Sequence, residues 1–164
     1  MESREMRLTR LVEAHQGLLL RICYVKLADA ELARDAVQET FLKACRALDD
    51  FRGEASERTW LIRIAVNTCR SMKRSGWLRH NDRRITPEDL PLAADVSRDE
   101  DVDLMCSVMA LPEKLREVIL LYYWQNMNVT EIARALGLGQ SAVSGRLARA
   151  RTKLRAMLEG RETK

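Results

Sequence analysis

The chain has 164 residues, enough for one medium-sized domain or two small ones, and a net charge of +4. Two basic blocks, residues 1–75 with 14 Lys and Arg against 11 Asp and Glu and residues 111–164 with 10 against 5, flank an acidic segment, a distribution that suits a polyanionic partner. The longest apolar run, residues 118–124, is too short to cross a bilayer and no signal peptide opens the chain, so we expect a cytoplasmic protein without membrane insertion.

The residue types that metal sites and catalytic centres need are scarce. The four cysteines form no Cys-x-x-Cys pair, and only two histidines accompany them, so no zinc spacing exists. A Gly-rich phosphate loop and a Ser/His/Asp constellation are also missing. We therefore expect no cofactor, no metal and no enzymatic activity, and we expect the cysteines to be thiols, three of them on apolar helix faces.

Helical periodicity dominates the first half of the chain. Apolar residues at helical spacing predict helices over residues 8–25, 32–48 and 60–72. A turn is expected at residues 27–30, and residues 49–56 form a polar loop with a glycine. Trp60 falls on the apolar face of the third helix, so we assign it to the core.

The opposite face of the third helix is basic. Its polar residues follow one another at steps of four, three and four: Arg63, Asn67, Arg70 and Arg74. Arginine binds phosphate as a fork, and asparagine both donates to and accepts from a base edge, so this face suits DNA. A solvated polar face would give the same spacing.

A segment without periodicity separates this first half from the second. Residues 76–98 hold two of the three prolines and several charges, which indicates a linker. Helical patterns resume at residues 102–110 and 113–125, and no strand alternation is present. The sequence therefore predicts an all-α fold with two small helical domains, residues 1–75 and 99–164, joined by a flexible linker.

The last third of the chain reads as a helix-turn-helix. Asn128 and Glu131 are spaced as a capping box, and Gly137 suits the left-handed end of a helix. The following helix, which starts at Gln140 or Ser141, is expected to bury one stripe: Val143, Leu147, Ala150, Leu154 and Met157. Its other faces carry cations, as a recognition helix in the major groove does. A surface helix of a bundle with a solvated basic face is the alternative.

Three motifs in order give the chain a family resemblance. Residues 35–44 (DAVQETFLKA), 51–54 (FRGE) and 59–68 (TWLIRIAVNT) resemble the first conserved domain of bacterial sigma factors of the extracytoplasmic-function (ECF) group. Residues 110–118 (ALPEKLREV) and the helix-turn-helix resemble the second. The resemblance implies a protein that binds core RNA polymerase, directs it to promoters and helps to open the DNA. A stand-alone helix-turn-helix regulator that binds an operator would explain only the second domain.

The resemblance also implies roles for individual residues. Core polymerase would dock on the outward side of the second helix, on Asp35, Gln38, Glu39 and Leu42, although a solvated acidic face has the same period. The −10 element would be read and melted by the loop after that helix and by the basic face of the third helix, through Phe51, Arg52, Arg58, Arg63, Asn67, Arg70 and Arg74. The −35 element would be read by Gln140, Ser141, Ser144, Arg146, Arg149 and Lys153.

Among these, Arg146 is expected to lie opposite the buried stripe and to reach a base edge, whereas Arg149 and Lys153 lie nearer the DNA backbone. The chain departs from the family pattern at Ser144, where a cation is usual, and at Gly145, which weakens the helix by about 1 kcal/mol relative to alanine. Glu57 stands where an aromatic residue is frequent, and it either changes base preference or is solvated. An anti-sigma factor is a further partner that the resemblance implies.

Overall fold

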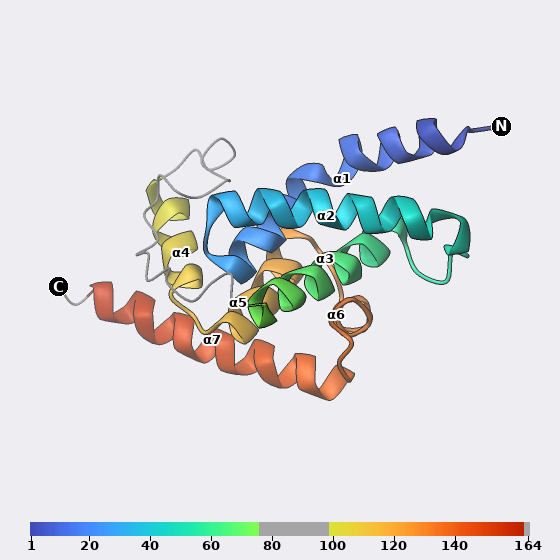
Figure 1. The fold of residues 1–164 in the computed structure, drawn as a ribbon. Coiled ribbons are helices and arrows are strands. Elements are labelled where there is room, and N and C mark those ends of the chain that lie inside the picture. The colour runs from blue at the N-terminus through green and yellow to red at the C-terminus, as the bar shows by residue number, and fades with distance from the viewer. Residues whose placement is uncertain (76–98, 163–164) are drawn as a thin grey trace. The chain divides into compact units, whose positions relative to one another are not determined.

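The computed structural model describes residues 1–75 and 99–162, and the chain divides into two compact units, residues 1–81 and 82–164. Every regular element among the described residues is a helix, which confirms the all-α prediction with two helical domains (Figure 1). The expected linker, residues 76–98, lies outside the described residues.

The first unit is a three-helix arrangement. It consists of α1 (Arg4–Leu27), α2 (Ala30–Ala47), the short 3₁₀ turn η1 (Leu48–Asp50) and α3 (Glu57–Arg74), and each of the three long helices packs against the other two. The core consists of the apolar stripes predicted from the sequence, and its largest fully buried side chains include Leu11, Leu19, Ile22, Leu48, Leu61 and Ile62. The buried stripes turn the remaining faces of α2 and α3 outward.

Polar residues fix where these helices begin and end. The Ser3 and Ser56 hydroxyls accept hydrogen bonds from the third N–H of α1 and of α3. Between α1 and α2, Ala28 takes a left-handed conformation with φ 54°, and the Asp29 carboxylate accepts from the Leu32 N–H at 3.0 Å. The predicted turn at residues 27–30 is thereby confirmed. Because Ser3 caps α1, that helix starts four residues before the predicted residue 8.

The second unit contains α4 (Asp99–Met109), α5 (Glu113–Ile119), the π-helical turn η3 (Leu120–Trp124), α6 (Val129–Leu136) and α7 (Gln140–Glu162). α7 packs on α4, α5 and α6, and the stripe Val143, Leu147 and Ala150 is fully buried in these contacts. Farther along α7, Leu154 and Met157 are only half-buried. The sequence predicted one helix over residues 113–125, but its last turn widens to π geometry, with the Gln125 N–H bonded to the Leu120 carbonyl at 3.2 Å.

All four cysteines are thiols. Cys23 of α1 and Cys69 of α3 are fully buried and share a hydrogen bond, which together with burial raises the pKa of the Cys23 thiol far above its ordinary range. Cys45 and Cys106 are half-buried. Within residues 1–75 and 99–162, no helix has the length and apolarity to cross a bilayer, and no three metal-binding side chains gather.

Candidate docking and nucleic-acid surfaces

The exposed side of α2 forms a continuous face, here called the docking face, made of Asp35, Gln38, Glu39 and Leu42. Glu39 is half-buried, and the other three are exposed, Leu42 to 52%. The opposite side of α2 is buried at Ala33, Ala36, Val37, Thr40 and Ala44. The docking face thus combines one exposed leucine with two acids and an amide on the side of α2 that the core does not use.

The loop between η1 and α3, residues 51–56, is built around an aromatic stack. The rings of Phe51 and Trp60 lie 4.6 Å apart between centroids at 29°, and the guanidinium carbon of Arg7 lies 5.8 Å from the Phe51 centroid. Gly53 reverses the chain with φ 75°, and Arg52 is exposed. Trp60, which was assigned to the core, is half-buried rather than fully buried, and its ring packs on Phe51.

Glu57, at the start of α3, is half-buried and paired with α1. Its carboxylate lies 3.3 Å from Arg10 Nη2 of α1, and its side chain is 32% exposed. Arg10 in turn pairs with Glu2 at 3.0 Å. Glu57 therefore ties α1 to the start of α3.

The basic face of α3 consists of Arg63, Asn67, Arg70 and Arg74, as the spacing predicted. Arg63, Asn67 and Arg74 are exposed, whereas Arg70 is half-buried and has contacts within the unit. Arg58, one turn before this face, is also half-buried with contacts of its own. Among the arginines predicted to contact the −10 element, the exposed ones are therefore Arg52, Arg63 and Arg74.

The helix-turn-helix forms as predicted. The Asn128 side chain accepts from the Glu131 N–H at 2.8 Å, and the Glu131 carboxylate accepts from the Asn128 N–H at 3.1 Å, a capping box. Gly137 ends α6 with φ 68°. The next helix, α7, starts at Gln140, whose amide donates to the Thr130 hydroxyl at 3.2 Å. These contacts fix the angle at which α7 leaves the turn.

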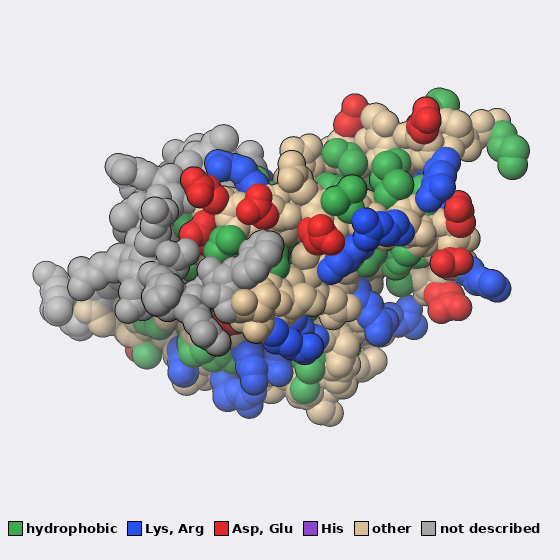
Figure 2. All heavy atoms as spheres, in the orientation of Figure 1, with side chains coloured by type: hydrophobic (Ala, Val, Ile, Leu, Met, Phe, Trp, Pro, Cys, Tyr) green, Lys and Arg blue, Asp and Glu red, His purple; other side chains and the backbone are tan. Residues whose placement is uncertain are grey.

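The exposed side of α7 is polar and basic, and Figure 2 shows Lys and Arg side chains gathered over it. Gln140, Ser141, Ser144, Arg149 and Lys153 are all exposed. A methyl group added at Gly145 would lie 3.4 Å from Nη1 of the exposed Arg149, an ordinary van der Waals distance, so alanine would fit at this position.

Arg146 is the exception, and here the expected geometry was wrong. Its side chain is 17% exposed and lies 3.6 Å from the carboxylate of Glu117 on α5, whose side chain is 5% exposed. It therefore lies beside the buried stripe and ties α7 to α5, instead of facing away from that stripe. Arg146 follows Val143 by three residues and precedes Ala150 by four, and these spacings already put it on the same side of α7 as the stripe.

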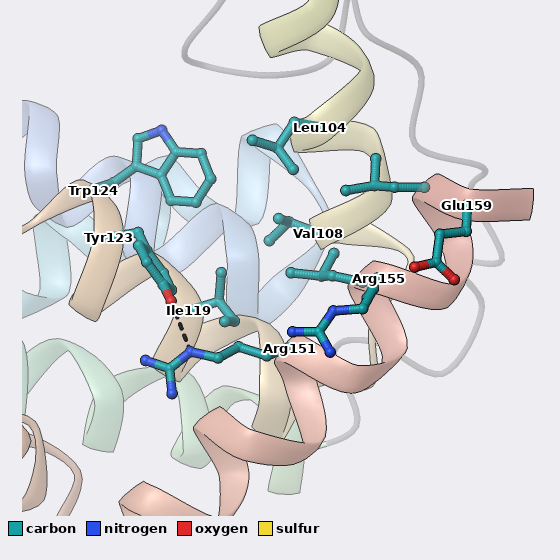
Figure 3. A pocket seen from close by; sticks show the side chains of 10 residues that line it. Leu104, Val108, Ile119, Tyr123, Trp124, Arg151, Arg155 and Glu159 are labelled. Carbon is teal, nitrogen blue, oxygen red and sulfur yellow. Dashed lines mark hydrogen bonds between the residues drawn. The ribbon is translucent and has the colours of Figure 1, made fainter. Parts of the chain in front are cut away.

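Two contacts of Arg151 in the second unit were not predicted from the sequence. The Arg151 Nε donates to the Tyr123 hydroxyl at 2.7 Å, which raises the pKa of Arg151, and its guanidinium carbon lies 5.3 Å from the Tyr122 ring. A pocket of about 560 Å³ opens beside this pair (Figure 3). Its walls come from α4, α5, η3 and α7 and include Leu104, Val108, Ile119, Trp124, Leu154 and Leu158.

A helix-turn-helix with a basic recognition helix, joined in one chain to a second helical unit with a basic face, defines a DNA-binding transcription protein. Comparison with known families agrees: sigma-70 region 2 matches residues 11–79, and sigma-70 region 4 matches residues 101–154. The chain belongs to the ECF group of RNA polymerase sigma factors.

Individual relatives agree with this assignment. The chain is 38% identical over 136 residues to the RNA polymerase sigma factor NccH of Alcaligenes xylosoxydans xylosoxydans, covering 76% of this chain and 72% of the relative. It is 30% identical over 152 residues to the ECF sigma factor SigM of Mycobacterium tuberculosis, covering 91% and 76%. The structure of CnrH in complex with the cytosolic domain of CnrY is similar with a TM-score of 0.68 at 32% identity, over 93% of this chain and 88% of that one.

The fold is also shared with the sigma factor RpoE of Bartonella quintana, with a TM-score of 0.74 at 23% identity over 94% of this chain and 96% of that one. As a sigma factor, the protein binds core RNA polymerase, directs it to promoters and helps to open the DNA for initiation. It is a transcription initiation factor. A stand-alone operator-binding regulator is not favoured, because both sigma regions are present.

Proposed function

We propose that the two units divide the work of promoter recognition. Residues 1–75 dock on core polymerase and read and melt the −10 element, residues 76–98 link the units, and residues 99–164 read the −35 element. The observation that carries this proposal is that the first unit exposes two unlike faces, the acidic docking face of α2 and the basic face of α3. The protein acts in the cytoplasm as a specificity factor and catalyses no reaction of its own.

An anti-sigma factor is the third proposed partner. Solved relatives are described in complex with the cytosolic domain of CnrY and with the anti-sigma factor NepR. The anti-sigma factor is proposed to cover the docking face, because the half-exposed leucine and the acidic groups of this face are also the proposed polymerase contact. An anti-sigma factor on that face would compete with core polymerase for the same side chains.

The basic face of α3 is proposed to act on the opened strand of the −10 element. Arg63 and Arg74 supply phosphate contacts, and the exposed Asn67 amide between them supplies a donor and an acceptor for an unstacked base. Unstacking a base costs a few kcal/mol, which contacts made only in the opened state offset.

Holoenzyme reconstituted from core polymerase and the unaltered chain should start transcription on a cognate promoter. Asn67→Ala should reduce promoter opening about tenfold or more, which corresponds to the loss of one hydrogen-bonding contact to a base. Permanganate reactivity of unpaired thymines near the start site reports opening. Ser71→Ala, an exposed change one turn on, is the matched control. Unchanged reactivity in Asn67→Ala, with normal core binding, would remove Asn67 from the site.

On the recognition helix, base reading is proposed for Gln140, Ser141 and Ser144 near its start, and phosphate binding for Arg149 and Lys153 one to two turns on. Arg146 reaches the DNA only if it leaves Glu117, and it is proposed to orient the helix.

The pocket of the second unit is proposed to take an apolar segment of core polymerase, its flap. The pocket is bounded by the half-exposed Leu158 and by Tyr123, while Arg151 and Arg155 give its edge a positive charge. An apolar side chain that enters such a pocket gains about 1.5–3 kcal/mol by leaving water.

Leu158→Glu should therefore weaken this contact about tenfold or more and lower transcription from promoters that depend on the −35 element. Ala156→Glu adds the same charge to an exposed position of α7 that does not line the pocket, and should have no such effect. Quantitative run-off transcription should be measured with both variants. Equal activity of the two chains would show that the pocket is not a polymerase contact.

A further inference from the structure

The first two turns of α1 carry three arginines at steps of three residues, Arg4, Arg7 and Arg10, and all three contact the segment that runs from the end of α2 to the start of α3. Arg4 donates to the Cys45 carbonyl at 2.6 Å and lies 3.8 Å from the Asp49 carboxylate. The other two contacts are the Arg7 guanidinium against the Phe51 ring and the Arg10 ion pair with Glu57. The three residues are here called the arginine ladder.

The ladder contacts this segment at three successive points along the chain. Arg4 holds the segment at η1, Arg7 at the start of the loop and Arg10 at the first residue of α3. These partners lie more than 40 residues away in the sequence. Because Arg52, Gly53 and Glu54 at the tip are exposed, the loop contributes little buried apolar surface of its own.

The two ends of the loop are also joined by the stack of Phe51 on Trp60. Arg7 lies against the Phe51 ring, so the cation and the indole both contact it. Without the ladder, the loop would keep the stack of Phe51 on Trp60 but would lose the charged contacts with α1 at both of its ends. The loop would then sample more conformations, while the core of the three helices, which contains none of these side chains, would stay packed.

We propose that Arg4, Arg7 and Arg10 are positioning residues that hold the loop in the conformation in which it reads the −10 element. The ladder thus sets −10 selectivity from α1, through the loop and without a base contact of its own. This inference rests on the proposed function, which assigns the loop to the −10 element.

The test compares holoenzyme made with the chain carrying Arg7→Gln and Arg10→Gln against the unaltered chain. Discrimination between −10 variants should fall about fivefold, the factor that corresponds to a strong exposed ion pair, while discrimination between −35 variants and affinity for core polymerase stay unchanged. Amide hydrogen exchange of residues 51–56 in the free protein should become faster, and exchange in the helices should not. Glu13→Gln, an exposed change one turn farther along α1, is the control and should alter neither readout.

A second pair of chains separates positioning from direct phosphate binding by the arginines. In a Glu2→Gln background, Arg10→Glu should lower −10 discrimination, and adding Glu57→Arg should restore it, because the ion pair is rebuilt with its charges exchanged. A phosphate contact by Arg10 would not be restored in this way. Failure of the exchanged pair to restore discrimination therefore overturns the inference.

Unchanged hydrogen exchange in the loop of the Arg7→Gln, Arg10→Gln chain would also overturn it. Faster exchange with unchanged −10 discrimination has a different meaning: the ladder would position the loop, and the assignment of the loop to the −10 element would be the part that fails.

Discussion

Core RNA polymerase should no longer co-purify with a chain in which Asp35, Gln38 and Glu39 are all replaced by alanine. The three side chains form one face of α2 and contribute nothing to the buried core of the unit. A few residues near the centre of an interface usually carry most of its affinity, so we expect a loss of about 100-fold or more. Alanine is the best helix former, so α2 should be at least as stable as before.

The matched control replaces Glu5, Glu13 and Gln16, two acids and one amide on the exposed side of α1, by alanine. Pull-down with core polymerase and far-UV circular dichroism should be measured on both chains. The control should bind normally. Loss of binding by the α2 chain together with loss of helical signal would show that these residues support the fold and are not the contact itself.

The second large effect is expected at Arg146. Replacing it with alanine removes a cation from beside the buried Glu117 carboxylate, and removing one partner of a buried ion pair commonly costs about 3–5 kcal/mol. Because the two charged groups are 3.6 Å apart and Glu117 has other contacts, we expect a loss of stability near the lower end of this range. We therefore expect the second unit to unfold at a lower temperature and binding to weaken equally for every −35 variant.

Lys153→Ala is the control, because Lys153 is exposed and lies on the same helix. It should leave the melting temperature unchanged and lower the slope of binding against salt by about one. The double change Glu117→Gln with Arg146→Gln should recover much of the stability, since no buried charge remains. If Arg146→Ala instead relaxed preference at one −35 position without changing the melting temperature, Arg146 would be a base reader.

Local signals in the sequence predicted local structure well. The capping box of Asn128 and Glu131 and the left-handed Gly137 depend on neighbours within four residues, so the helix-turn-helix could be placed without a model of packing. The exposed faces of α2 and α3 followed from period alone, because each helix has one clear apolar stripe.

Contacts between helices could not be predicted in this way. Arg146 meets Glu117, and Arg10 meets Glu57, across 29 and 47 residues, and each pair depends on the angle at which two helices pack. The widened turn at η3 contains no glycine or proline, so no local residue type indicates that α5 ends at Ile119. The polymerase and DNA contacts themselves remain predictions for the experiments described above.

The unequal burial of the cysteines gives the chain a natural pair of labelling positions. Cys23 and Cys69 are shielded, whereas Cys45 at the end of α2 and Cys106 in α4 are partly open, one in each unit. A maleimide dye under mild conditions should select these two, because a thiol out of contact with water reacts slowly. Energy transfer between dyes on Cys45 and Cys106 would then follow the spacing of the two units in the free chain, on an anti-sigma factor and on polymerase, with no cysteine introduced.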